Sequence, residues 1–147
     1  MRRAGKSVTV RSSAICDANI AVRWLVDHPT SGFAIEAREA HDLIAPQQLL
    51  AEVANALRGH VRAGLLPLEM AQTHLVRLPR QIELRPEDSL MPLALRLSIE
   101  HAHPVYDCVY VAMALTLNCP LVTADGKLAK AFAGLRGLQL QQPLEAL

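Results

Sequence analysis

The sequence is poor in aromatic residues and has no long apolar run. Of its 147 residues, one is Trp, two are Tyr and two are Phe, although 51% are hydrophobic. Leu, Ala and Val must therefore fill the core of a single compact domain. The longest apolar run, residues 105–117, is too short to span a bilayer and contains Asp107. We expect a cytoplasmic protein that does not enter a membrane.

Cysteine is also scarce, and the familiar cofactor motifs are missing. Cys16, Cys108 and Cys119 lie in apolar segments without C-x-x-C spacing, so we expect reduced, buried thiols. No His-x-x-x-His pair indicates a zinc site. Neither a Gly-x-Gly-x-x-Gly sequence nor a Walker A sequence is present to hold a nucleotide. The net charge is +1, which does not predict a surface that binds nucleic acid in general. A local cluster of basic residues around a site is still compatible with it.

Four acidic residues stand out because each lies inside an apolar stretch. A buried carboxylate costs several kcal/mol unless a positive charge or hydrogen bonds compensate it. Four such residues indicate acids gathered around a cation, and oxygen ligands suit Mg²⁺ or Mn²⁺. These acids are Asp17, Glu52, Asp107 and Asp125.

Each acid also has a simpler explanation. Asp17 and Asp125 precede predicted helices and could be N-caps. Glu52 and Asp107 lie in predicted first helical turns, where negative charge is favoured. These explanations account for single residues, but not for the apolar surroundings of all four.

Short apolar runs alternate with helical periodicity, which predicts an α/β fold with a mainly parallel sheet. Strands are expected at residues 13–16, 43–46, 81–84, 120–123 and 138–141, and helices at 18–26, 33–41, 48–62, 68–78, 89–101, 104–117 and 127–133. In such sheets, sites form beyond the carboxyl ends of the strands. Asp17 and Asp125 directly follow strands, so the four acids can converge at one end of the sheet.

Four short motifs follow one another along the chain: Asp17-Ala-Asn19, Glu52-Val-Ala-Asn55-Ala-Leu57, Tyr106-Asp107-Cys-Val-Tyr-Val-Ala112 and Thr123-Ala-Asp125. In this order they resemble the PIN domain, and more narrowly the VapC-type toxins of bacterial toxin–antitoxin pairs. The resemblance implies one PIN domain over residues 13–147, after an N-terminal extension at 1–12. It implies a three-layer sandwich in which helices flank four to five short, mainly parallel strands. Asn19 departs from the family pattern, which more often has serine or threonine there.

The resemblance implies a Mg²⁺- or Mn²⁺-dependent endoribonuclease. Asp17, Asp107 and Asp125 would hold the metal, and Glu52 would complete the acidic site. Residues that would orient these acids are Asn19, Asn55 and Thr123. Arg58, Arg62, Lys127 and Lys130 are candidates for contacts with RNA phosphates.

The resemblance also implies partners: a structured RNA such as tRNA or rRNA, a cognate VapB-like antitoxin and a second copy of the chain. Two other functions stay open. A catalytically silent PIN-like binding module would keep the fold, although it would not need four buried acids. A metal-dependent DNA nuclease or phosphatase would use the same pocket.

Overall fold

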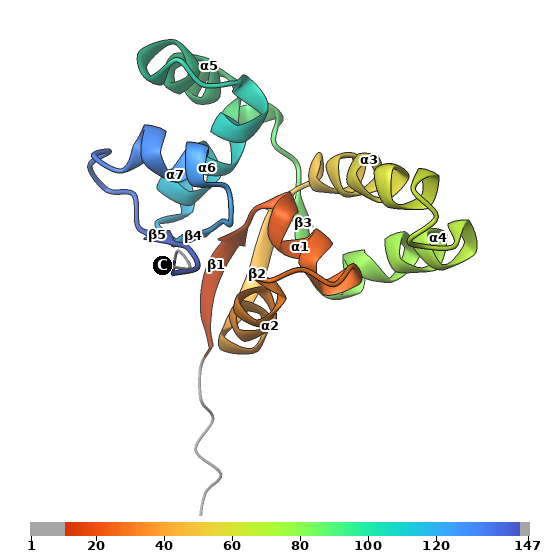
Figure 1. Cartoon of the computed structure of the whole chain (residues 1–147). Coiled ribbons are helices and arrows are strands. Elements are labelled where there is room, and N and C mark those ends of the chain that lie inside the picture. The colour runs from red at the N-terminus through yellow and green to blue at the C-terminus, as the bar shows by residue number, and fades with distance from the viewer. Residues whose placement is uncertain (1–10, 145–147) are drawn as a thin grey trace, which may run out of the picture.

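A parallel five-stranded sheet forms the centre of this computed structural model, which describes residues 11–144 (Figure 1). The strand order is β3-β2-β1-β4-β5. Every neighbouring pair is parallel, with Ile15 opposite Ile44 and Cys16 opposite Val122. The strands are β1 (Ser12–Cys16), β2 (His41–Pro46), β3 (Glu83–Arg85), β4 (Leu121–Val122) and β5 (Leu140–Gln141). The predicted α/β fold with a parallel sheet is confirmed.

Helices cover both faces of the sheet. They are α1 (Ala18–Leu25), α2 (Ser31–Ala40), α3 (Leu49–Arg62), α4 (Leu68–Arg77), α5 (Met91–His101), α6 (Val105–Leu117) and α7 (Gly126–Phe132), with 3₁₀ turns η1 (Leu78–Arg80) and η2 (Asp88–Leu90). Connections between parallel strands are right-handed, so the direction of a connection along the sheet decides the face that its helices cover. The chain runs one way from β1 to β3 and the opposite way from β3 to β5. Helices α1–α4 therefore lie on one side and α5–α7 on the other (Figure 1).

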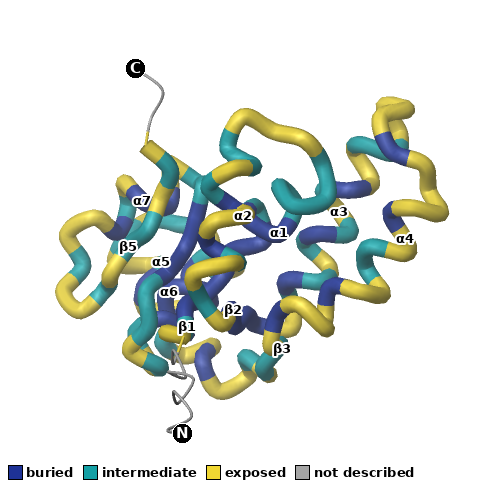
Figure 2. The backbone as a smooth tube through the Cα atoms, turned by 90° about the horizontal axis from the view of Figure 1, so that it is seen from below, coloured by how far each residue is buried: buried dark blue, intermediate teal, exposed yellow. Residues whose placement is uncertain are grey.

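One part of the core lies between the sheet and helix α6, and another part lies between the sheet and helices α1–α3. Residues Ala14, Ile15 and Cys16 of β1 are fully buried. In α6, seven consecutive residues from Cys108 to Ala114 are buried, because β1, β2 and β4 contact one side and α5 the other (Figure 2). A helix that is apolar all round requires cover on all sides. This burial fixes the position of α6, and with it the position of Asp107.

Helices α3 and α4 form a hairpin that projects away from the sheet (Figure 1). Helix α3 packs against α1, whereas the outer surface of the hairpin is open to solvent. Its exposed large apolar residues are Leu65 (71% exposed), Leu68 (59%), Met70 (50%) and Val76 (72%). Charged residues such as Arg62 and Glu69 are exposed beside them. No helix within residues 11–144 has the length and apolar character needed to cross a membrane.

The structure corrects two details of the predicted elements. Strand β1 begins at Ser12, inside the predicted extension, while residues 1–10 and 145–147 lie outside the described part. The helix predicted at 89–101 begins as a 3₁₀ turn, and α5 starts just before Pro92, which has no N–H for an interior helical hydrogen bond. Glu87 directly precedes the 3₁₀ turn but makes no side-chain capping hydrogen bond to it. Its carboxylate accepts hydrogen bonds from the backbone N–H groups of Gln47 (3.0 Å) and Gln48 (3.2 Å), at the start of α3.

Candidate active site

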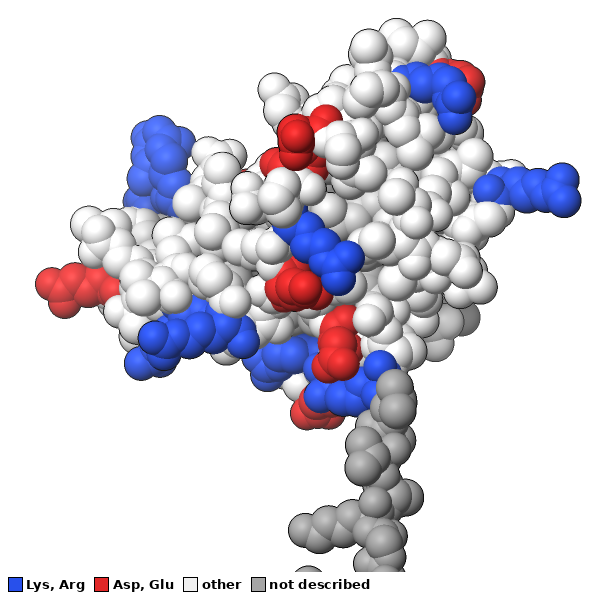
Figure 3. All heavy atoms as spheres, turned by 180° about the vertical axis from the view of Figure 1, so that it is seen from behind, with Lys and Arg blue, Asp and Glu red and all other residues white. Residues whose placement is uncertain are grey.

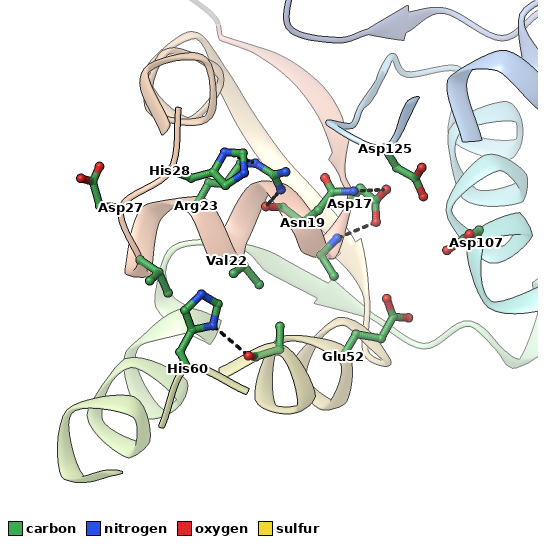
Figure 4. A pocket seen from close by; sticks show the side chains of 13 residues that line it. Asp17, Asn19, Val22, Arg23, Asp27, His28, Glu52, His60, Asp107 and Asp125 are labelled. Atoms are coloured by element: carbon green, nitrogen blue, oxygen red, sulfur yellow. Dashed lines mark hydrogen bonds between the residues drawn. The ribbon is translucent and has the colours of Figure 1, made fainter. Parts of the chain in front are cut away.

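A cavity of about 400 Å³ opens at the carboxyl ends of β1 and β4. These neighbouring strands continue in opposite directions along the sheet, and ligand sites of doubly wound folds form at this switch point. The cavity is lined by Asp17, Glu52, Asp107 and Asp125 (Figure 4). They come from the end of β1, from α3, from α6 and from the start of α7. The structure thus brings together all four acids that the sequence singled out.

Asp17 is the most enclosed of these acids, with 4% of its surface exposed. Its Oδ1 accepts a hydrogen bond from the backbone N–H of Ala18 (2.7 Å), and its Oδ2 accepts from Thr123 Oγ1 (2.7 Å) and Asn19 Nδ2 (3.0 Å). Burial, together with repulsion by Asp107 and Asp125, raises the pKa of Asp17 to about 6, although the hydrogen bond from Thr123 acts in the opposite direction. The Asp17 site therefore favours an added positive charge.

Asn19 and Thr123 connect Asp17 to the segment that bears Asp125. Asn19 Oδ1 accepts a hydrogen bond from the backbone N–H of Ala124 (3.0 Å), and Thr123 Oγ1 accepts one from that of Asp125 (3.0 Å). Asp125 caps α7, because its Oδ1 accepts from the N–H groups of the next turn. Asp17 and Asp125 therefore each have two roles: both belong to the acidic site, and both are N-caps of the helices that follow them.

Glu52 reaches the cavity from the first turn of α3. Its Oε1 accepts a hydrogen bond from Gln48 Nε2 (2.7 Å), and its Oε2 accepts one from the hydroxyl of Tyr110 (3.2 Å). Burial, followed by repulsion from Asp17, raises the pKa of Glu52 to about 7, although both hydrogen bonds act in the opposite direction. The carboxyl group can therefore gain or lose a proton near neutral pH.

Asp107 is paired with a histidine that the sequence analysis did not select. His103 Nε2 lies 2.7 Å from Asp107 Oδ2, and the His103 side chain is only 11% exposed. Its ring packs against the edge of Phe132, with 5.7 Å between the ring centroids. His103 is therefore largely enclosed beside Asp107, and its i, i+4 spacing from Asp107 was visible in the sequence.

Of the three residues predicted to orient the acids, two contact Asp17 and one does not. Asn19 and Thr123 touch Asp17, whereas Asn55 is exposed and does not line the cavity, although it shares a helix with Glu52. None of the four predicted phosphate-binding cations lines the cavity. Arg58 and Arg62 instead border an apolar groove between α3 and α4, because their positions on α3 turn them away from Glu52.

The cavity also contains residues that sequence reasoning missed. Arg23, Asp27, His28 and His60 line the end farther from Asp107 (Figure 4). Arg23 and His28 lie on α1 and directly after it, and only the packing of α1 against α3 brings them beside His60. The nearest sequence signal was the i, i+4 spacing of Asn19 and Arg23.

The acids suit a divalent cation in chemistry, but they do not form a closed cage. Among residues 11–144, no group of three or more His, Cys, Asp or Glu side chains is placed closely enough to hold a metal ion. The donors are all oxygens, which Mg²⁺ and Mn²⁺ prefer. Within the same part of the chain, no hydrogen bond reaches Asp107 Oδ1 or Asp125 Oδ2. With the raised pKa values of Asp17 and Glu52, this set fits a metal held partly through water.

The fold and the cavity define a doubly wound α/β domain with a carboxylate site at its switch point. The family model of the PIN domain matches residues 15–147, so the chain belongs to the PIN-domain family. The predicted resemblance is confirmed.

Three known proteins illustrate the similarity. Ribonuclease VapC1 of Mycobacterium tuberculosis is 38% identical over 87 residues, which are 59% of this chain and 65% of the relative. The chain therefore spans slightly less than two thirds of that relative. Ribonuclease VapC3 of Pyrobaculum aerophilum is 35% identical over 103 residues, or 68% of this chain and 76% of the relative. A toxin–antitoxin complex from Klebsiella pneumoniae contains a chain with the same fold, at a TM-score of 0.64 and 19% identity, covering 85% of this chain and 94% of that one.

Proposed function

We propose that this chain is a Mg²⁺- or Mn²⁺-dependent endoribonuclease and the toxin of a type II toxin–antitoxin pair. The observation that carries the proposal is the convergence of Asp17, Glu52, Asp107 and Asp125 on one cavity. Two relatives of this chain are named ribonucleases. A catalytically silent module would have no reason to keep two carboxyl groups with pKa values raised by burial.

Asp17, Asp107 and Asp125 would hold the metal, directly or through water. When bound, a divalent ion neutralises the phosphodiester and lowers the pKa of a coordinated water. Thr123 and Asn19 fix the orientation of Asp17 through their hydrogen bonds to Oδ2. His103 holds Asp107 Oδ2, so that Oδ1 remains to face the cavity.

Glu52 is our candidate for the general base. A base works best when its pKa lies near the working pH, and burial brings that of Glu52 to about 7. Gln48 and Tyr110 hold the two carboxylate oxygens in place, which fixes where the proton is received. Removing the Tyr110 hydroxyl would therefore alter the pH dependence of cleavage as well as its rate.

The substrate that we favour is a folded RNA, such as a loop of tRNA or rRNA. The chain carries fifteen Lys and Arg residues against fourteen Asp and Glu residues. On the face in Figure 3, both signs are interspersed and neither forms a continuous area. Few phosphates can then be neutralised at once, so binding to arbitrary RNA should be weak. Recognition of shape and of unpaired bases agrees better with such a surface.

We further propose a homodimer that binds a cognate VapB-like antitoxin. The structural neighbour from Klebsiella pneumoniae is described as a toxin–antitoxin complex. The apolar groove between α3 and α4 would receive an apolar antitoxin segment, with Arg58 and Arg62 at its rim to pair with acidic neighbours.

The test is cleavage by the Asp107→Asn variant, with Asp88→Asn as the matched control. Asn can still accept the hydrogen bond from His103, whereas Asp88 is an exposed acid outside the cavity. We expect Asp107→Asn to lower the Mg²⁺-dependent cleavage of RNA by about a hundredfold or more. Its melting temperature without metal should be unchanged, and Mg²⁺ should no longer raise it.

Wild-type activity distinguishes the alternative functions. Purified protein is incubated with Mg²⁺ and with RNA, DNA or a phosphomonoester. Cleavage of DNA alone would identify a DNA nuclease, and release of phosphate alone would identify a phosphatase. Either result would contradict RNA as the substrate. Inactivity on all three, together with no effect of Mg²⁺ on melting, would favour the silent binding module. Full activity of Asp107→Asn would remove the proposed metal site.

A further inference from the structure

The end of the cavity farther from Asp107 has a different chemistry from the acidic end. Arg23, His28 and His60 lie there, together with Asp27 (Figure 4). Among the described residues that line the cavity, Arg23 is the only arginine or lysine. An anionic substrate that reaches the four acids therefore meets one permanent positive charge within the same cavity.

Uncharged groups hold the Arg23 guanidinium in place. Its Nη1 donates to the backbone carbonyl of Asn19 (2.8 Å), and its Nε donates to Thr30 Oγ1 and to His28 Nδ1 (3.3 Å). Within residues 11–144, Nη2 donates to no protein group. Nε and Nη1 are thus anchored, and the N–H groups of Nη2 remain available to a ligand.

Arg23 does not pair with the acids around it. No carboxylate among the described residues lies within ion-pair distance of its guanidinium, although Asp17 and Asp125 act on it electrostatically and Asp27 lines the same end. A flexible arginine would be expected to move toward such charges. Asn19 and Thr30 hold the Arg23 guanidinium away from these carboxylates, so no ion pair within the described residues neutralises its charge.

His28 supplies a second donor beside Arg23. Its Nδ1 accepts hydrogen bonds from the backbone N–H of Thr30 (3.1 Å) and from Arg23 Nε, so the proton of the neutral ring lies on Nε2. His28 is exposed, which leaves Nε2 accessible. The two side chains are fixed in one hydrogen-bonded cluster.

We propose that Arg23, supported by His28, binds the RNA phosphate next to the scissile phosphate. This inference rests on the proposed ribonuclease function and adds a substrate contact to the same cavity. A guanidinium suits the task because its planar N–H groups pair with two phosphate oxygens. Asn19 couples the two ends of the cavity: its side chain orients Asp17, and its carbonyl group anchors Arg23.

The first experiment compares Arg23→Gln with Arg58→Gln. Both variants remove one positive charge, but Arg58 lies outside the acidic cavity. Binding of a fluorescein-labelled RNA hairpin is measured at several salt concentrations with Mg²⁺ present, in the inactive Asp107→Asn background. We expect Arg23→Gln to weaken binding about tenfold and to reduce the salt slope by about 1. Arg58→Gln should change the two quantities much less, and Arg23→Lys should restore the salt slope.

The second experiment locates the contact without relying on a mutation alone. Single phosphates of the hairpin loop are replaced in turn by neutral methylphosphonates. At the contacted position, the replacement should weaken binding to the Asp107→Asn protein (the parent protein) about tenfold. It should leave binding to the Arg23→Gln variant of that protein almost unchanged. Melting temperatures of all variants show whether each remains folded.

The outcomes separate this inference from the proposed function. If the parent protein binds RNA with no such position, or if Arg23→Gln matches Arg58→Gln in affinity and salt slope, the Arg23 contact is wrong even if wild-type protein cleaves RNA. If wild-type protein cleaves no RNA but binding still depends on Arg23, the ribonuclease function is wrong and the phosphate contact stands. If Arg23→Gln unfolds, Arg23→Lys and the methylphosphonate scan with the parent protein decide.

Discussion

At the scale of single residues, Thr123 connects Asp17 to the segment that bears Asp125. Its side chain is fully buried, donates to Asp17 Oδ2 and accepts from the backbone N–H of Asp125. Replacing it by valine keeps the shape but leaves two buried polar groups without this partner. We expect Thr123→Val to lower the free energy of unfolding by roughly 1–3 kcal/mol and to reduce cleavage strongly.

Thr123→Ser is the control, because serine keeps the hydroxyl and removes only a methyl group. Urea unfolding followed by circular dichroism measures the stability of both variants. A Thr123→Val protein as stable and as active as Thr123→Ser would contradict the role assigned to the hydroxyl.

The raised pKa values of Asp17 and Glu52 predict how stability changes with pH. Folding raises the pKa of Asp17 from 3.8 to about 6 and that of Glu52 from 4.5 to about 7. The folded chain therefore holds these protons more tightly than the unfolded chain. The resulting stabilisation is present below the unfolded pKa values and is lost as pH rises through the folded ones. Metal-free protein should lose stability between about pH 4 and about pH 7.

Melting temperatures measured across this range in EDTA test the expectation. Glu52→Gln should flatten the decline, since glutamine does not titrate and can still bond to Gln48 and Tyr110. Mg²⁺ should raise the melting temperature of wild-type protein more above pH 7 than below pH 5. An equally steep decline in Glu52→Gln would show that Glu52 is not responsible.

At the scale of elements, the ends of α5 and α6 need the same backbone conformation but carry residues that tolerate it differently. Helices α5 and α6 both end in a left-handed residue, Ala102 (φ 50°) and Asn118 (φ 51°). Asn tolerates this conformation, whereas Ala is strained there by its Cβ atom. We expect Ala102→Gly to raise the free energy of unfolding by roughly 1 kcal/mol.

Ala133→Gly is the matched control for this change. Ala133 is exposed and follows α7 with ordinary helical dihedral angles (φ −56°, ψ −31°), so glycine there only adds flexibility to the unfolded chain. Thermal and urea unfolding should show stabilisation by Ala102→Gly and a small loss for Ala133→Gly. Losses of equal size in both variants would exclude strain at Ala102.

At the scale of the whole molecule, the α3–α4 hairpin presents its apolar surface away from the core. Leu68 lies on this surface and also lines the groove between the helices. We expect Leu68→Glu to weaken binding of the proposed VapB-like antitoxin about tenfold or more, because a charge enters an apolar contact. Cleavage by the free enzyme should be unchanged.

Isothermal titration measures the binding, and light scattering measures the mass of the free and the bound protein. Ile99→Glu on α5 is the control, since Ile99 is 77% exposed and lies on the opposite side of the sheet. Equal binding by both variants would remove the groove as the antitoxin site. A free protein that stays monomeric at micromolar concentration would contradict the proposed homodimer.

The sequence by itself determined the order and type of the elements and the identity of the acids. Strand β1 and the helix after it were predictable, because apolar patterning and the capping residue Asp17 are local signals. The same holds for β4, Asp125 and α7. Each acid stood out because a charge within an apolar segment is costly, and that cost is visible without coordinates. The parallel sheet then implied that residues following the strands would meet at one edge.

Only the tertiary structure decided which distant side chains meet there. The carboxylate that binds the backbone N–H groups just before α3 belongs to Glu87, which lies about forty residues farther along the chain. Arg58 and Arg62 turn away from the cavity and Arg23 enters it, because the packing of α1 against α3 sets the rotation of both helices. Local patterns specify which face of a helix is apolar, but they do not specify what that face meets. That choice depends on the connections between strands and on the packing of the whole core.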